Sequence, residues 1–379
     1  MRMRLYKGIR EIDSFAMRKQ TENVSNTQEF LFHNGGQILR NCATLSCLLN
    51  KPIRVSKIRA GRSNPGLRPQ HLTGLQLIRD ICNGKLEGGV VSSSEITFIP
   101  GKVKAGSYTG DTKTAGSICL LMQAALPCFI YADGEVTLRL LGGTNADMAP
   151  QIDYALMVFR PFAAKFGMNF TGSILRRGFY PKGGGEVQVK VFPSKCLNAV
   201  DATDRGQLTR VTGQAFVAGV LPIKVARAMS HSAQDVVRNL YPDASMHIDV
   251  KQETSASAFG TGTGITIVGE TSTGCILAGS GLGKRGVPAE KVGEDAGEML
   301  LNSLDHGGCV DDFLQDQIII LMALAKGKSR VLCGPMSLHT QTAIHVAQLM
   351  TEAKFEVKEL SKTSTLIECE GIGLVNPYL

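Results

Sequence analysis

The chain has 379 residues, of which 43% are hydrophobic and 20% are charged, and its net charge is +8. This length leaves room for two domains with large cores, and the composition is that of a globular protein rather than a disordered or fibrous one. The longest apolar run, 318–325, is too short to cross a bilayer, so no membrane association is expected. The basic charge suits a polyanionic partner such as nucleic acid, although many unrelated enzymes share it.

The ten cysteines are scattered and form neither a CxxC pair nor a Cys/His spacing suited to zinc. Most of them lie in apolar stretches, which predicts small buried side chains with free thiols. Free thiols are typical of a reducing compartment, and no apolar signal region follows the basic N-terminus. The sequence therefore predicts an intracellular protein.

Residues 1–30 are polar and without periodicity, which predicts an irregular leader. An α/β pattern begins near residue 31, and glycine turns near 35 and near 184 indicate repeated βα units about 75 residues long. Apolar spacing in the first half predicts helices at 38–49, 72–82, 114–126 and 149–166, and strands at 52–58, 95–99 and 136–141.

A polar, turn-rich stretch at 198–210 reads as a linker. The pattern after it predicts strands at 211–220, 246–250, 264–269 and 274–279, and helices from Pro222 and over 288–304. A strongly apolar helix is then expected at 311–325, followed by strand, helix and strand to the C-terminus. The predicted architecture is an α/β body, 31–203 and 305–379, interrupted by an insert domain at 204–304.

The run 177–187 contains three consecutive glycines at 183–185, with Arg176, Arg177 and Lys182 beside them. Glycines let an anionic ligand approach the main chain closely, and the neighbouring cations would favour such a ligand. The alternative is a tight hairpin in which the glycines relieve strain, because 186–191 alternates like a strand leaving a turn.

His339 follows a glycine and a proline that would block a helix, while Ala343, Ala347 and Met350 show helical spacing after it. It is therefore predicted at a helix N-terminus, where the partial positive charge lowers the pKa of an imidazole and free N–H groups attract phosphate. A neutral imidazole there could act as a nucleophile. The alternative is a capping or packed histidine.

Two further segments combine chemistry-bearing side chains. The loop 57–71 carries Arg59, Arg62 and Arg68 beside His71, and arginines on a rigid loop suit bidentate binding of phosphate oxygens. The alternative is a solvated basic loop. In the segment 311–317, acidic residues suit the first turn of a helix, but Phe313 could also stack on a flat ring while Asp316 and Gln317 bind a nucleotide.

Together with the glycine run, these segments resemble the RNA 3'-terminal phosphate cyclase family, with the eukaryotic catalytic cyclase as the nearest type. The resemblance extends from Gly35-Gly36-Gln37-Ile38-Leu39-Arg40 through 142–150 to Leu338-His339-Thr340 and covers about nine-tenths of the chain. It implies an α/β (α+β) fold in which a large domain of three repeated units, each a four-stranded sheet with two helices, carries a small thioredoxin-like α/β insert.

The resemblance also implies a reaction. A histidine takes AMP from ATP, the AMP passes to the RNA 3'-phosphate, and the neighbouring 2'-hydroxyl closes a 2',3'-cyclic phosphate as AMP leaves. This is covalent catalysis followed by activation of a poor leaving group. The implied partners are ATP and RNA 3'-phosphate ends, a divalent metal (magnesium or manganese) is expected, and no obligate protein partner is. The implied location is the nucleus (nucleoplasm), with the cytoplasm as a further site.

The family's motifs assign residues by position. His339 matches the adenylated histidine. Positions that match the adenosine pocket are Gln123, Pro150, Phe313, Asp316 and Gln317, with Phe313 in place of a tyrosine. Positions that match the phosphate and RNA end are Arg40, Arg59, Arg62, Arg68, Gln70 and His71.

One departure concerns the metal. Where the family's first motif has a glutamate expected to bind the metal, this chain has His33, and a neutral imidazole is a poorer magnesium ligand. The metal ligands are therefore left unassigned. This departure keeps open a second interpretation, a non-catalytic cyclase-like factor of ribosome assembly. A third is a phosphate-handling transferase of related architecture, such as enolpyruvylshikimate-phosphate synthase.

Overall fold

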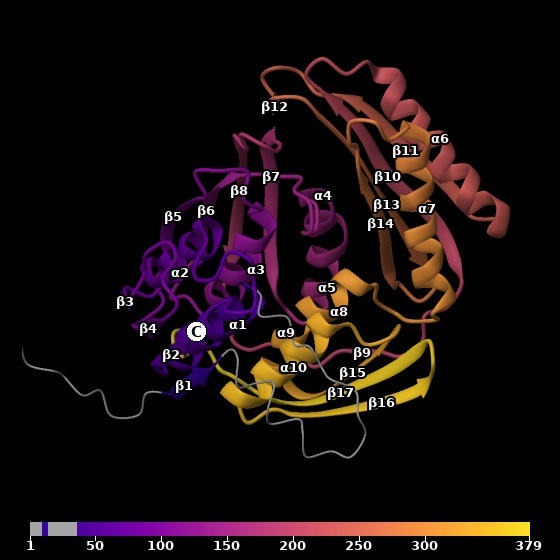
Figure 1. Cartoon of the computed structure of the whole chain (residues 1–379). Coiled ribbons are helices and arrows are strands. Elements are labelled where there is room, and N and C mark those ends of the chain that lie inside the picture. The colour runs from indigo at the N-terminus through magenta and orange to yellow at the C-terminus, as the bar shows by residue number, and fades with distance from the viewer. Residues whose placement is uncertain (1–9, 14–35) are drawn as a thin grey trace, which may run out of the picture.

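The computed structural model describes residues 10–13, for which only the backbone is considered, and residues 36–379. These residues form a mixed α/β structure, as the sequence predicts, and their strands make up four sheets (Figure 1). Three sheets belong to the body, and the fourth lies in a separate lobe seen at the upper right of Figure 1.

The first body sheet has the strand order β1-β2-β4-β3, with β1 parallel to β2 and the other pairs antiparallel. Its elements are β1 (Arg10–Asp13), α1 (Gly36–Leu49), β2 (Ile53–Ser56), α2 (Pro69–Ile81), β3 (Lys85–Glu87) and β4 (Ile96–Ile99). Strand β1 corrects the prediction that 1–30 is irregular throughout. Four residues with a single apolar member show no alternation in sequence, so only pairing with β2 reveals the strand.

The second body sheet has the order β12-β7-β8-β6-β5. Its strands are β5 (Gly106–Asp111), β6 (Val136–Gly142), β7 (Asn169–Gly178), β8 (Gly185–Phe192) and β12 (Ala258–Phe259), and its helices are α3 (Ile118–Phe129), α4 (Ile152–Tyr154), the π-helical turn η2 (Ala155–Phe159) and α5 (Arg160–Lys165). The helix predicted at 149–166 is thus divided, because Pro161 cannot donate a backbone hydrogen bond into the preceding turn.

The third body sheet has the order β16-β17-β15-β9. Its elements are β9 (Asp201–Ala202), α8 (Asp312–Gln317), α9 (Ile319–Leu324), β15 (Lys326–Cys333), α10 (Leu338–Met350), β16 (Lys354–Ser361) and β17 (Ser364–Ile372). In all three body sheets the first strand along the chain pairs in parallel with the second. The fourth strand along the chain lies between the second and third, and in the second sheet β12 is added at the edge as a fifth. The single helix predicted at 311–325 is two short helices that meet at Ile318.

The lobe contains β10 (Leu208–Ala218), α6 (Ile223–Leu240), β11 (Ser245–Gln252), β13 (Gly262–Thr271), β14 (Ile276–Leu282) and α7 (Ala289–Asp305). Its sheet has the order β11-β10-β13-β14, and α6 and α7 pack on one face of it (Figure 1). This lobe occupies the segment predicted as an insert, while its precise limits and its likeness to thioredoxin remain predictions. Between β11 and β13 the chain returns to the body, where β12 pairs with β7.

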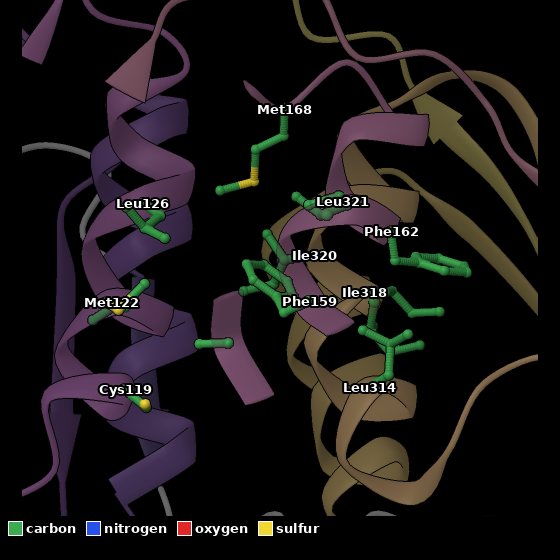
Figure 2. Packing of buried hydrophobic residues seen from close by; sticks show 14 of the residues in the cluster. Cys119, Met122, Leu126, Phe159, Phe162, Met168, Leu314, Ile318, Ile320 and Leu321 are labelled. Atoms are coloured by element: carbon green, nitrogen blue, oxygen red, sulfur yellow. The ribbon is translucent and has the colours of Figure 1, made fainter. Parts of the chain in front are cut away.

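Apolar side chains of separate body elements meet in one core. Figure 2 shows Met122 and Leu126 of α3 on one side of it, and Phe159, Ile320 and Leu321 on the other. The ten cysteines all lie within 36–379 and carry free thiols, nine of them buried, in agreement with the prediction. No helix in the described residues is long and apolar enough to cross a membrane.

The glycine run forms the hairpin between β7 and β8. Gly183 and Gly184 adopt φ values of +71° and +73°, which side chains rarely tolerate. A Cβ on Gly183 would meet the backbone of Thr114, and one on Gly184 would meet the ring of Phe259. The glycines are therefore needed for a sharp turn with close packing, in agreement with the alternative of a tight hairpin, and the prediction that they admit an anionic ligand stays a prediction. Arg177 beside them is buried in an ion-pair cluster.

Candidate active site

A cleft of about 400 Å³ opens where helices from different body sheets begin or pass. The first residues of α1, α2 and α10 line it together with side chains of α3 and α8. Free N–H groups at helix N-termini give such a place a positive potential. Nine residues predicted from the sequence line this cleft: Arg40, Arg59, Arg62, His71, Gln123, Pro150, Phe313, Asp316 and His339.

His339 lies in the first turn of α10, as predicted. Ser337 caps this helix, and its Oγ accepts a hydrogen bond from the N–H of Thr340 at 3.1 Å. The His339 side chain is exposed to the cleft, and its Nδ1 lies 2.8 Å from Oε1 of Gln37. One ring nitrogen is therefore held by the protein, and the alternative of a packed histidine does not apply.

Gln37 links this histidine to a carboxylate. Its Nε2 donates to Oδ2 of Asp316 at 2.7 Å, which turns its Oε1 toward His339. Because an amide oxygen only accepts, Nδ1 of His339 must carry a proton, and in the neutral imidazole the unprotonated nitrogen is then Nε2. Sequence reasoning quoted Gln37 within a motif but gave it no role. Its position one turn before Arg40, directly after two glycines, was the available signal.

Arg40 and Asp316 form the charged floor of the cleft. Burial raises the pKa of Asp316 to about 7, although the charge of Arg40 opposes this rise. Burial likewise lowers the pKa of Arg40 to about 10, against the attraction of Asp316. Nη2 of Arg40 donates to Oε1 of Gln123 at 3.3 Å, but its Nε is buried and meets no acceptor among the described residues. A guanidinium left partly unsatisfied is prepared for an anionic ligand.

His71 stands beside this floor in the neutral form. Burial lowers its pKa to about 4, and the charges of Arg59, Arg40 and Arg68 lower it further. Nδ1 of His71 accepts from the N–H of Arg68 at 3.3 Å, so Nε2 carries the proton and can donate. The ring lies so close to Gly36 that a Cβ there would overlap Nε2. Glycine at the first position of α1 therefore leaves the room that the imidazole of His71 occupies.

Of the three arginines in the loop 57–71, two line the cleft and one does not. Arg59 has φ +52°, and its Nη1 donates to the carbonyl of Asn64 at 2.7 Å, which stiffens the loop. Arg62 is exposed at the cleft wall. Arg68 and Gln70, predicted at the same site, do not line it. Arg68 is the exposed N-cap residue of α2, and Oε1 of Gln70 accepts from the N–H of Ser117 at 3.0 Å, which ties α2 to the start of α3.

The opposite wall carries the residues assigned to an adenosine pocket. The ring of Phe313 is half-buried, and it makes a T-shaped contact with Tyr154, with the ring centres 5.7 Å apart and the planes at 67°. Asp311 caps α8 and fixes this aromatic pair, because its Oδ1 accepts from the hydroxyl of Tyr154 at 2.5 Å and from the N–H of Phe313 at 3.1 Å. Gln317 lines a small adjoining space rather than the cleft itself.

No cluster of three histidine, cysteine or acidic side chains that could hold a metal occurs within the described part of the chain. His33, which stands at the family's glutamate position, lies outside the described residues. The cleft therefore offers cations, amide groups and the imidazoles of His71 and His339 rather than a carboxylate cage. Such a site suits a ligand with several phosphate groups.

Comparison with known proteins gives one family. The sequence model of the family described as RNA 3'-terminal phosphate cyclase matches residues 31–357. A relative from Drosophila melanogaster, named RNA 3'-terminal phosphate cyclase, is 40% identical over 345 residues, 91% of this chain and 96% of the relative. One from Pyrococcus furiosus with the same name is 39% identical over 325 residues, 86% of this chain and 92% of the relative. The chain therefore belongs to the RNA 3'-terminal phosphate cyclase family.

Proposed function

We propose that the protein converts an RNA 3'-terminal phosphate into a 2',3'-cyclic phosphate with consumption of ATP, through AMP bound covalently to His339. In enzyme terms this is a ligase-type reaction that proceeds by nucleotidyl transfer. The observation that carries the proposal is the hydrogen-bonded chain from Asp316 through Gln37 to His339, which opens onto a cleft lined by arginines.

The chain of hydrogen bonds prepares a nucleophile. With a proton held on Nδ1 by Gln37, the neutral imidazole of His339 would use Nε2 as the nucleophilic nitrogen. In the first step Nε2 forms a bond to the α-phosphorus of ATP, the bond from that phosphorus to the bridging oxygen breaks, and pyrophosphate leaves with the electron pair. The N-terminus of α10 and the guanidinium of Arg40 stabilise the negative charge that develops on the phosphate oxygens.

The next two steps use the same cleft. An oxygen of the RNA 3'-phosphate attacks the α-phosphorus, the phosphorus–nitrogen bond breaks, and the AMP becomes linked to the RNA end as RNA(3')pp(5')A. The 2'-hydroxyl then attacks the 3'-phosphorus, loses its proton and expels AMP. Arg59 and Arg62 line the cleft and would hold the RNA phosphate, and Nε2–H of His71 would donate to a phosphate oxygen, of ATP in the first step and of the RNA end in these two.

We further propose that the adenine of ATP stacks on Phe313 and Pro150. The half-buried ring of Phe313 offers an aromatic face, and its other contacts keep it in one orientation. Gln123 supplies an amide at the same wall, although its Oε1 already accepts from Arg40. A divalent metal would be expected on the triphosphate, but the described residues hold no carboxylate cluster for it, and we derive no step through it.

Self-adenylation tests the proposal directly. We expect the wild-type protein, incubated with ATP labelled at the α-phosphorus and with magnesium or manganese, to retain acid-labile label. The variant His339→Ala should retain none. His345→Ala is the matched control, because this half-buried histidine lies on the same helix but does not line the cleft, and it should label like the wild type. Equal labelling of His339→Ala and wild type would exclude His339 as the nucleophile.

The second interpretation is a non-catalytic factor, and the His33 position favours it. A labelled wild-type protein that also converts a 3'-phosphorylated RNA into a phosphatase-resistant end would exclude it. A wild-type protein that binds no ATP and takes up no label under either metal would support it instead.

A further inference from the structure

A second hollow, of about 660 Å³, lies between the body and the lobe and is larger than the active-site cleft. Its walls come from the N-terminal halves of α6 and α7, the ends of β13 and β14, and two loops of the body. We call it the upstream hollow. None of the residues that the family resemblance assigns to the reaction lines it.

The floor of the upstream hollow is apolar. Val225 and Met229 of α6 and Val292 of α7 contribute to it, together with Leu282 at the end of β14. Tyr180 stands at its edge with a side chain that is 84% exposed, on the hairpin between β7 and β8. An exposed aromatic ring beside an apolar floor is suited to a flat ligand that can stack.

The rim of the upstream hollow is cationic. Lys284 and Arg285 lie on it, both exposed, and exposed Lys182 is two residues from Tyr180. The single acidic residue in its walls is Asp147, whose Oδ1 pairs with Nζ of Lys284 at 3.3 Å. Apolar surface surrounded by positive charge fits a base attached to a phosphate backbone better than it fits an apolar peptide.

The upstream hollow and the active-site cleft share one wall. In the loop 143–151, Asn145 and Asp147 face the upstream hollow, whereas Met148 and Pro150 line the cleft. The loop is fixed at its far end, because Nε2 of Gln151 donates to backbone carbonyls of β13 and β14. A single ligand strand that leaves the cleft over Met148, which is 99% exposed, would therefore reach the upstream hollow.

We propose that the upstream hollow binds a nucleotide of the RNA strand on the 5' side of the reacting 3'-phosphate. Its base lies on the apolar floor against Tyr180, and the neighbouring phosphates pair with Arg285, Lys284 and Lys182. This inference rests on the proposed function for the identity of the ligand. It adds a site that selects RNA strands over short 3'-phosphorylated fragments.

The test compares two substrates: a 3'-phosphorylated dinucleotide, and a single-stranded 3'-phosphorylated RNA roughly twelve nucleotides long, within the length that one single-strand site covers. We expect Tyr180→Ser to weaken the affinity for the long RNA about 5- to 100-fold, the loss typical of one stacked base, and to leave the dinucleotide unchanged. Arg285→Ser should reduce the salt dependence of long-RNA binding by about one counterion. Tyr378→Ser, at another exposed tyrosine, is the matched control.

The proposal is overturned if Tyr180→Ser and Arg285→Ser bind the long RNA as tightly as the wild type, which would leave a protein partner as the occupant. It is also overturned if both substrates and self-adenylation are weakened equally, because that pattern indicates a general structural effect. Binding is measured by fluorescence anisotropy without ATP. If the proposed function is wrong, the wild-type protein takes up no label. The binding comparison does not depend on that result, because it is made without ATP.

Discussion

Arg40 and Arg177 are two arginines held among carboxylates, and they differ in how completely they are satisfied. Arg177 donates from Nη1 and Nη2 to both oxygens of Asp153 at 2.8 and 2.7 Å and from Nε to Glu253 at 2.9 Å. Its guanidinium also lies 4.0 Å from the ring centre of Phe216. Arg40 has one long bond to Gln123, and its buried Nε meets no acceptor in the described residues.

The carboxylates respond in opposite directions. Burial disfavours the charge on Asp153, yet hydrogen bonds and charge from Arg177 outweigh it and lower the pKa of Asp153 below its ordinary value. At Asp316 burial dominates over the attraction of Arg40, and its pKa rises to about 7. A satisfied cluster joins parts of the fold, here body and lobe. A cluster with unsatisfied donors, such as that of Arg40, can bind a ligand. The number of hydrogen bonds that each arginine makes therefore distinguishes the Arg40 site from the Arg177 cluster better than its charge does.

Arg177→Met is expected to have the largest effect on stability. It would leave Asp153 and Glu253 buried without their partner, and breaking a buried ion pair in this way costs about 3–5 kcal/mol of the free energy of unfolding. Chemical denaturation measures the loss. The control is Arg139→Met, which removes an exposed pair with Glu186 and should cost less than about 1 kcal/mol. Similar losses in the two variants would contradict the assignment of Arg177 as a structural residue.

Arg40→Met should show the reverse pattern. Because Arg40 is poorly satisfied, its loss is expected to change the free energy of unfolding by less than about 1 kcal/mol. Self-adenylation, however, should slow about 100-fold or more, the loss typical of removing one preorganised donor from a developing negative charge. Initial rates of labelling at saturating ATP measure it. A variant that is strongly destabilised yet labels at the wild-type rate would reverse our reading of the two arginines.

The local parts of this comparison could be predicted from sequence. His339 at a helix start and Phe313 in the first turn of α8 follow from glycine, proline and capping residues a few positions away. The role of Gln37 could not be predicted, because its bond to His339 joins residues 302 positions apart. For the same reason the sequence could not show that Gly184 packs against Phe259 of a distant segment rather than against a ligand.

The fold too could be predicted where the local sequence shows a clear apolar pattern, and not elsewhere. Helices with an apolar stripe, such as α1 and α2, agree closely with the predicted ranges. Strands β5 and β7 were not predicted. Strand β5 reads Gly-Ser-Tyr-Thr-Gly-Asp, and β7 mostly alternates exposed and half-buried positions, so neither shows an apolar alternation. Both are strands because neighbouring strands satisfy their backbone groups, which is information the local sequence lacks.

Asp316→Asn tests whether the pKa of the Asp316 carboxyl is raised, in contrast to that of Asp153. The pKa of this carboxyl is about 7 in the folded protein against an ordinary 3.8. Between these values the folded state holds a proton that the unfolded state has lost, so the free energy of unfolding falls as pH rises through this window and levels off above it. Each unit of such a shift amounts to about 1.4 kcal/mol. The variant should lose the part of this slope that comes from Asp316 and keep the part that comes from Asp311, whose pKa burial raises to about 6. Asp312→Asn on the same helix should keep the whole slope. Equal slopes for wild type and Asp316→Asn would contradict the raised pKa of Asp316.

Gly36→Ala adds a single methyl group and tests whether His71 takes part in binding ATP. The new Cβ would overlap Nε2 of His71 and push the ring away from the cleft that Arg40 shares. We expect the affinity for ATP to fall about 10- to 150-fold, because loss of one hydrogen bond to a charged group weakens binding by about 1.5–3 kcal/mol. Equilibrium binding of a fluorescent ATP analogue measures the change.

The matched substitution is Gly74→Ala in α2. Its Cβ would lie 3.8 Å from the nearest atom, a methyl of Leu121, which is ordinary contact. Replacing a helical glycine by alanine should stabilise the protein by about 0.5–1 kcal/mol. ATP affinity should not change in this variant. If Gly36→Ala also bound ATP like the wild type, His71 would have no part in binding the phosphates of ATP. Arg40 would then be the main phosphate-binding group of the cleft.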